Sequence, residues 1–143
     1  MIEAPRRPRL ISLTILGFVL LSALQLWKVV ALWQQSALLL ELHVRPDPRL
    51  RMVVALLWSL IFLGAAIAIW RRNEATRWLA PLLLVGYVAY ELAFLALFAQ
   101  VSINEQRWLL HGLVAGALLV WTIMALNNSA ARSYFSEEKT AVT

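Results

Sequence analysis

Apolar residues fall into four long blocks along the chain, at 10–33, 52–70, 78–100 and 108–126. A helix rises about 1.5 Å per residue, so blocks of roughly 20 residues suffice to cross a hydrocarbon layer of about 30 Å. Lipid offers no partner for free backbone groups, which restricts spanning segments to helices and closed barrels. The pattern predicts an all-α polytopic integral membrane protein: a four-transmembrane-helix bundle with short loops and one membrane domain over 1–143.

Composition supports this assignment, because 62% of the 143 residues are hydrophobic and only 15% are charged. Such values are typical of membrane proteins. The net charge of +5 does not indicate nucleic-acid binding, since most arginines flank the apolar blocks, where orientation signals and anionic headgroups explain them. The absence of cysteine excludes disulfides and thiolate metal sites. We therefore expect the lipid bilayer to be the main partner.

The longest connection lies between residues 34 and 51, and it has two interpretations. Residues 36–44 read as a short interfacial helix, with leucines on one side and Glu41 towards water. Alternatively, the first helix continues past the bilayer to Val44. Pro46 and Pro48 end the helical pattern in either case. The first apolar block is too long for a secretory signal, so we expect a retained transmembrane helix.

The distribution of basic residues indicates the orientation of the spans. One side holds eight of them: Arg6, Arg7, Arg9, Arg71, Arg72, Arg77, Arg132 and Lys139. The opposite side holds four: Arg45, Arg49, Arg51 and Arg107. Basic residues accumulate on the cytoplasmic side, so we expect both termini in the cytoplasm and the protein in the plasma (inner) membrane.

Glu91 lies close to the middle of the third block and is the most costly residue in the sequence. An acid at such depth usually faces the interior of a bundle and has a partner. Counting from the centre of each span, Lys28, Glu91 and His111 lie about 10, 4 and 9 Å towards the non-cytoplasmic face. If the first and third helices are neighbours, Lys28 and Glu91 are within reach of an ion pair.

Other polar side chains share a helical face with these groups. Gln25 falls on the same side of the first helix as Lys28, and Tyr87 and Tyr90 lie beside Glu91 on the third. Ser59 could join them from the outer half of the second span. A helix in lipid gathers polar residues on one side only where that side meets protein or water. The sequence therefore predicts an outer-leaflet polar cluster.

Each member of this cluster also has a purely structural interpretation. Lys28 can extend to the headgroups, and His111 can be a hydrogen-bonded interfacial histidine. Tyr87 and Tyr90 can serve packing with a polar tip. Glu91 is either half of a structural pair, a substrate or proton site, or a contact with another subunit.

Small residues recur at a spacing of four on three predicted spans, among them the second and the fourth. Gly112 and Gly116 form a GxxxG, and Gly64 and Ala68 repeat the spacing on the second span. Small residues let helix backbones approach closely in lipid. We expect these positions to pack helices, either within the bundle or against a second protein.

No phosphate loop, nucleophile elbow or metalloprotease motif is present, so catalysis is not expected. Two histidines without cysteine do not indicate a metal or haem site, and we expect no cofactor. The leading hypothesis is a non-catalytic accessory or scaffold subunit that docks on helices of a membrane protein partner or on a second copy. The alternative is a small transporter or a lipid- or quinone-binding protein with its site around Glu91.

In size and number of spans the chain is similar to the small multidrug transporters, a family that works as dimers and uses an acid in the first helix. Here the first helix carries Lys28, and the acid, Glu91, lies in the third. The resemblance therefore transfers no site residue.

Overall fold

The computed structural model describes residues 8–41, 47–98 and 105–141, with side chains at all of these positions except 39–40, 98, 105–111 and 137–141. The described part is helical and contains no strand. Its helices, in chain order, are α1 (Arg9–Glu41), α2 (Pro48–Trp70), α3 (Thr76–Phe98), α4 (Glu105–Asn127) and α5 (Ser129–Ala141).

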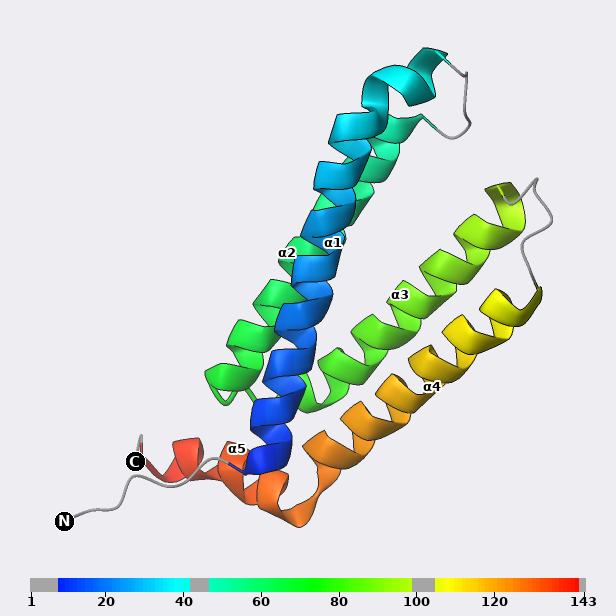
Figure 1. Ribbon diagram of the computed structural model, residues 1–143. Helices are drawn as coiled ribbons and strands as arrows, with labels where there is room; N and C mark the ends of the chain where they lie inside the picture. The colour runs from blue at the N-terminus through cyan, green and yellow to red at the C-terminus, as the bar shows by residue number, and fades with distance from the viewer. Residues whose placement is uncertain (1–7, 42–46, 99–104, 142–143) are drawn as a thin grey trace.

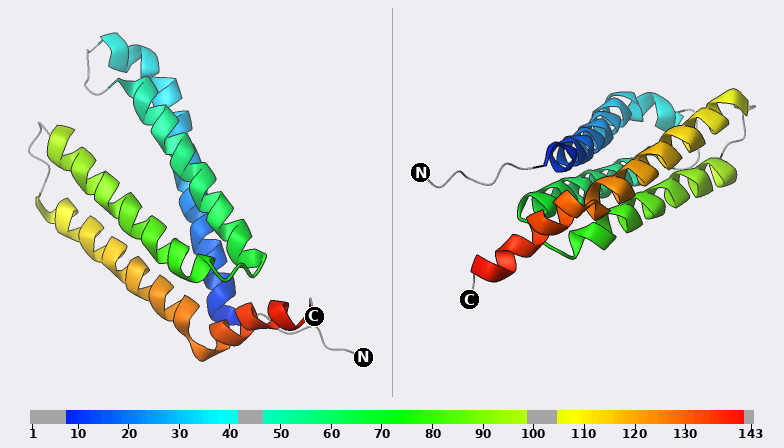
Figure 2. Two further views of the ribbon diagram at one scale, coloured as in Figure 1. Left: turned by 180° about the vertical axis from the view of Figure 1, so that it is seen from behind. Right: turned by 90° about the horizontal axis from the view of Figure 1, so that it is seen from below.

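The four long helices form two antiparallel pairs that diverge like the arms of a V (Figure 1). One arm is α1 with α2, and the other is α3 with α4. The arms meet near the α2–α3 turn, where α5 crosses the end of the array, as the views from behind and below also show (Figure 2). Around the array α1 contacts α2 and α4, and α3 contacts α2 and α4. Helices α1 and α3 are therefore diagonal to each other.

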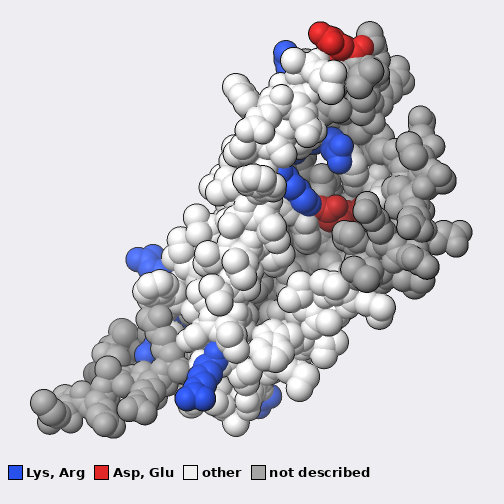
Figure 3. All heavy atoms as spheres, in the orientation of Figure 1, with Lys and Arg blue, Asp and Glu red and all other residues white. Residues whose placement is uncertain are grey.

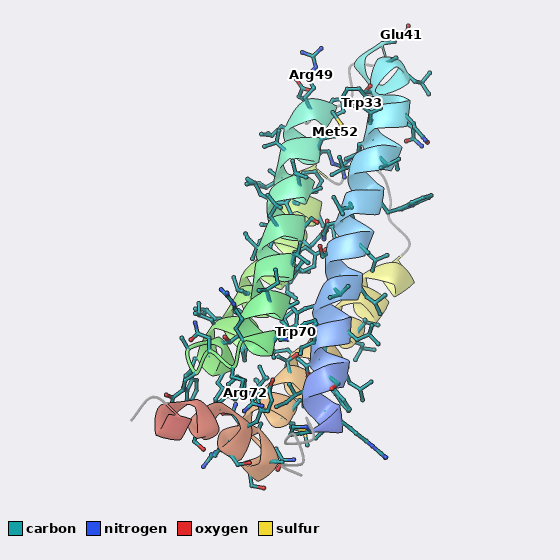
Figure 4. The ribbon with its side chains drawn as sticks, turned by 90° about the vertical axis from the view of Figure 1, so that its left-hand side faces the viewer. Trp33, Glu41, Arg49, Met52, Trp70 and Arg72 are labelled. Carbon is teal, nitrogen blue, oxygen red and sulfur yellow. The ribbon has the colours of Figure 1, made fainter. Side chains whose placement is uncertain are left out.

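The α1–α2 pair is the most closely packed part of the molecule, and its helices run side by side along their length (Figure 4). The buried residues of α2 that face α1 recur at alternating steps of four and three: Ala55, Ser59, Phe62, Ala66 and Ile69. This is the repeat that keeps one seam of a helix against its partner.

A serine pair stands at the middle of the α1–α2 seam. The hydroxyl of Ser22 donates to the carbonyl of Ser59 at 3.0 Å, and the hydroxyl of Ser59 donates to the carbonyl of Ser22 at 3.1 Å. Both serines are buried. Small side chains with satisfied hydroxyls allow backbones to approach closely in lipid. The seam therefore holds α1 and α2 together as one rigid arm.

The apolar core lies at the closed end of the V. It combines the first half of α1, the last half of α2, the start of α3 and the end of α4 with Tyr134 and Phe135 of α5. Helix α5 is bent by 57° from α4. Its buried positions, Ala131, Tyr134 and Phe135, lie on one face, as the i, i+3, i+4 spacing of an amphipathic helix requires. The other end of the V has no comparable core among the described residues.

The α2–α3 turn is fixed by hydrogen bonds to the last carbonyls of α2. The amide of Asn73 donates to the carbonyl of Ala68 at 3.1 Å, and that of Arg72 donates to Ile69 at 3.1 Å. Arg72 has φ of 60°, the left-handed conformation that usually follows a helix terminated in this way. Its guanidinium lies 4.4 Å from the centre of the Tyr134 ring, on the side of the α1–α2 arm that faces α5 (Figure 4). The turn thus also anchors α5.

The helices are long and apolar enough to span a membrane. Three qualify alone, Arg9–Leu38, Pro48–Trp70 and Thr76–Leu97, and a fourth qualifies if Gly112–Asn127 and Ser129–Ser136 count as one bent span. Large apolar side chains are exposed along α1, α2 and α3, including Leu24 at 58% and Leu82 at 66%. Contiguous exposed apolar surface of this kind requires an apolar surrounding. The chain is consistent with an integral membrane protein.

Helix boundaries differ from the expected spans in two places. Helix α1 runs unbroken to Glu41, so 36–41 continue the first helix, while 42–44 lie outside the described residues. Helix α3 begins at Thr76, which places Pro81 inside the helix and leaves the carbonyl four residues earlier without its helical donor. Residues 99 and 100 of the expected third span also lie outside the described part.

Candidate functional site

Four polar side chains connect the diagonal helices across the V. Gln25 and Lys28 are one turn apart on α1, and Tyr87 and Glu91 are one turn apart on α3. Residues at these spacings lie on one face of a helix. Glu91 Oε1 accepts from Lys28 Nζ at 2.9 Å and from the Tyr87 hydroxyl at 2.9 Å. The Tyr87 hydroxyl accepts from the Gln25 amide at 2.5 Å, so the contacts are continuous.

We call these four residues the polar bridge. Because α1 and α3 are diagonal, the bridge crosses the interior between the two arms. There the two helices are joined by long side chains and not by close packing of their backbones. The side chain of Lys28 is 48% exposed and that of Glu91 is 35% exposed. A basic and an acidic side chain meet beside a hollow on the face of the molecule shown in Figure 3. The bridge is therefore accessible from the cleft rather than sealed in a core.

An aromatic cluster supports the bridge on the side of α2. The Trp58 ring stands edge-on to Tyr87 with 5.1 Å between centroids, and it lies 5.9 Å from the Tyr90 ring. Phe62, which is fully buried, contacts both Trp58 and Tyr87 at 5.6 and 5.1 Å. Edge and offset arrangements are the favourable ones for aromatic pairs. The cluster fixes the ring of Tyr87 and hence the hydroxyl that serves Glu91.

Two cavities flank the bridge and share three of its residues, Gln25, Lys28 and Glu91. The first, the α2-side cavity, has a volume of about 260 Å³ and lies between α1, α2 and α3. Its wall is mixed: Gln35 and Arg51 add polar groups, and Trp58, Tyr90 and Phe94 add aromatic surface.

The second, the α4-side cavity, has a volume of about 360 Å³ and lies between α1, α3 and α4. Apart from the polar bridge, the described residues that line it are apolar: Leu21, Leu24, Trp27, Val88, Leu92, Leu95, Gly112 and Ala115. Around the shared polar bridge, the described lining of the α2-side cavity is therefore partly polar and aromatic, and that of the α4-side cavity is apolar. Such a pair of surroundings accommodates a molecule with a polar and an apolar part.

The structure brings together most of the residues selected from the sequence. Gln25, Lys28, Tyr87 and Glu91 form the polar bridge, and Tyr90 lines the α2-side cavity beside it. Ser59 does not join them, because its hydroxyl belongs to the α1–α2 seam. The helical position of His111 is within α4, but its side chain lies outside the described residues.

The three glycines among the small-residue positions have no close neighbour in the described part of the chain. A Cβ atom built on Gly64, Gly112 or Gly116 would meet no described atom within 4 Å. Ala68 lies on the same helix, at intermediate exposure. Close packing within the chain uses the serine and alanine seam of α1 and α2 instead.

Two residues of the site were missed by the sequence reasoning. Arg51 was counted only as an orientation signal, and Trp58 was not selected. Both line the α2-side cavity with Ala55, and their spacing of i, i+4, i+7 on α2 was the available signal. A basic residue at the start of an apolar span and on the same helical face as an aromatic residue indicates a lined cavity as readily as a flanking charge.

The described residues contain no group of three or more His, Asp or Glu side chains placed to hold a metal ion. The polar bridge presents one acid, one amine, one phenol and one amide, a set that can bind, orient or exchange a proton with a ligand. No protein-family model matches the chain, and no curated protein sequence or solved structure is significantly similar to it.

Proposed function

We propose that this chain is a non-catalytic integral membrane protein that binds an amphipathic molecule in the cleft between its two arms. The four long helices form an open four-helix bundle, with both termini on the cytoplasmic side of a plasma (inner) membrane, as the basic residues indicate. The polar part of the ligand contacts the polar bridge, and the apolar part extends along the leucines of the cleft.

One observation carries this proposal: an ion pair between diagonal helices is flanked by cavities of about 260 and 360 Å³. A pair with only a structural role is best sealed by packing, because charges in an apolar surrounding are costly. Here Lys28 and Glu91 are 48% and 35% exposed at a depth where acyl chains offer no hydrogen bond. Water or the polar part of a ligand must therefore solvate them.

A cavity-filling variant tests the proposal. Ala31 lines the α2-side cavity, so Ala31→Trp should occupy it, whereas Ala23, exposed on the same helix, provides the matched control Ala23→Trp. Delipidated protein is titrated with palmitoyl-oleoyl phosphatidylcholine and phosphatidylglycerol, and bound lipid is counted by native mass spectrometry. We expect Ala31→Trp to reduce retained lipid at least about five-fold and Ala23→Trp to leave it unchanged. Equal retention by all three folded proteins would refute a cleft site.

The small residues without a close neighbour among the described residues favour a second function: the protein is an accessory subunit that docks on the helices of a partner. Gly64 and Gly116 are exposed and meet no described atom within 4 Å of a built Cβ. In lipid, such positions permit close approach of another helix. Purification in mild detergent at native expression should recover a stoichiometric partner, and Gly116→Leu should release it. Recovery of a clean monomer would exclude this second function.

A further inference from the structure

Arg51 is the charged group of the α2-side cavity that the polar bridge does not use. It extends from the first turns of α2 to α3, where its guanidinium carbon lies 4.6 Å from the centre of the Phe94 ring. Among the described residues no carboxylate lies within ion-pair distance of it, whereas Lys28 is paired with Glu91 at 2.9 Å. The described wall of the cavity thus holds two cations and one anion.

The Arg51 guanidinium forms no hydrogen bond with another described residue beside its contact with the Phe94 ring, so its N–H donors are available there. A guanidinium carries five such donors in one plane. A planar fork of this kind matches the two oxygens of a phosphate or a carboxylate. Because the ring holds the guanidinium in place, less side-chain freedom is lost when an anion binds.

The position of Arg51 along the membrane normal fits a lipid headgroup. It lies three residues after Pro48, or about 5 Å from the start of α2. Gln35, which lines the same cavity, lies seven residues after Lys28 on α1, or about 10 Å further out. The cavity therefore runs from headgroup level, where Arg51 and Gln35 stand, to the polar bridge and the aromatic rings at greater depth.

We propose that the α2-side cavity binds the anionic headgroup of a membrane lipid, a phosphate or carboxylate held by Arg51, with the acyl chains leaving through the cleft. This rests on the proposed function and specifies the class of ligand. The acid that balances Lys28 is already within the cavity, and Arg51 has no carboxylate within ion-pair distance among the described residues, so its charge selects an anion over a neutral or zwitterionic headgroup.

The test compares two lipids that differ only in the headgroup, together with a soluble phosphate that has no acyl chains. Purified, delipidated protein is titrated with palmitoyl-oleoyl phosphatidylglycerol, palmitoyl-oleoyl phosphatidylcholine or glycerol 3-phosphate, and binding is followed by native mass spectrometry. We expect phosphatidylglycerol to bind at least about ten-fold more tightly than phosphatidylcholine, as one charge-assisted contact allows. Glycerol 3-phosphate should neither bind nor displace the lipid, because it lacks the apolar part.

Two variants assign this preference to the cavity. Arg51→Gln should lower phosphatidylglycerol affinity about ten-fold and change phosphatidylcholine affinity less than two-fold. Arg49→Gln removes a charge from the same helix, but Arg49 projects away from the α1–α2 pair (Figure 4) and does not line the cavity. It should change both affinities less than two-fold.

The outcomes separate the two proposals. Tight and equal binding of both lipids overturns the anion preference and leaves the cleft site standing, whereas failure of both lipids to bind overturns both. Equal losses in Arg49→Gln and Arg51→Gln would show attraction to the membrane surface rather than a site, and displacement by glycerol 3-phosphate would show a soluble anion as the ligand. If Arg51→Gln does not fold, Arg51→Lys, which keeps the charge but lacks the planar fork, replaces it in the comparison with Arg49→Gln and should likewise lower phosphatidylglycerol affinity.

Discussion

A double-mutant cycle on the ion pair tests whether the polar bridge couples the two arms. Lys28→Met removes the ammonium and keeps the length of the side chain. Glu91→Gln removes the charge and keeps an oxygen that accepts the Tyr87 hydroxyl, so the loss is confined to the contact with Lys28. Each single change leaves one charge without its partner, whereas the double change leaves none.

The separation of 2.9 Å between Lys28 Nζ and Glu91 Oε1 sets the scale of the coupling energy. Coulomb's law gives about 6 kcal/mol of attraction at an effective dielectric constant of about 20, and about 1.4 kcal/mol in bulk water. Desolvation opposes this attraction. Because the two side chains are 48% and 35% exposed, we expect a net coupling of about 1–3 kcal/mol, between the values for surface pairs and sealed ones.

Reversible unfolding in mixed micelles of increasing sodium dodecyl sulfate fraction provides the measurement, followed by far-ultraviolet circular dichroism. We expect each single variant to be destabilised and the double variant to lose about 1–3 kcal/mol less than the sum of the two. Arg132→Met, which removes an exposed charge on α5, is the control and should show no coupling with Glu91→Gln. Effects of Lys28→Met and Glu91→Gln that add within about 0.5 kcal/mol would refute the bridge.

Two further predictions concern the rigid part of the fold. Ser59→Leu places a large side chain in the buried α1–α2 seam and removes the hydroxyl partner of Ser22, so the same unfolding assay should show a loss of about 2–4 kcal/mol. The control Gly64→Leu, on an open face of the same helix, should change the free energy of unfolding by less than about 0.5 kcal/mol. Equal losses in the two variants would contradict the assignment of Ser59 to the seam. Tyr134→Ala removes a buried ring that holds α5. Limited proteolysis should therefore cleave α5 faster in this variant than in Arg132→Ala or in the unmodified protein. An unchanged rate of cleavage would show that α5 is held by other contacts.

Hydrophobic patterning alone was sufficient to predict a helical membrane protein, because in lipid an uninterrupted apolar helix of about 20 residues is the stable solution whatever its neighbours are. Depth along each helix was equally predictable, since it follows from rise per residue. Lys28 and Glu91 were therefore assigned to one leaflet, and Tyr87 to the face of the third span that carries Glu91. The hydrogen bonds that join them in the structure depend in addition on how the helices are arranged around one another.

Lateral arrangement was not contained in the pattern. The choice of neighbouring helices depends on how side chains interdigitate around each helix axis. In this protein, that packing buries Ser59 in the α1–α2 seam and places α1 diagonal to α3. The same packing concentrates the core at one end, bends α5 onto it and leaves the other end open. Arg51 illustrates the difference between depth and lateral arrangement. Its depth follows from its position in the sequence, where it reads as a charge that flanks a span. Its role as a candidate ligand contact depends on the ring of Phe94 opposite it and on the cavity that both residues line.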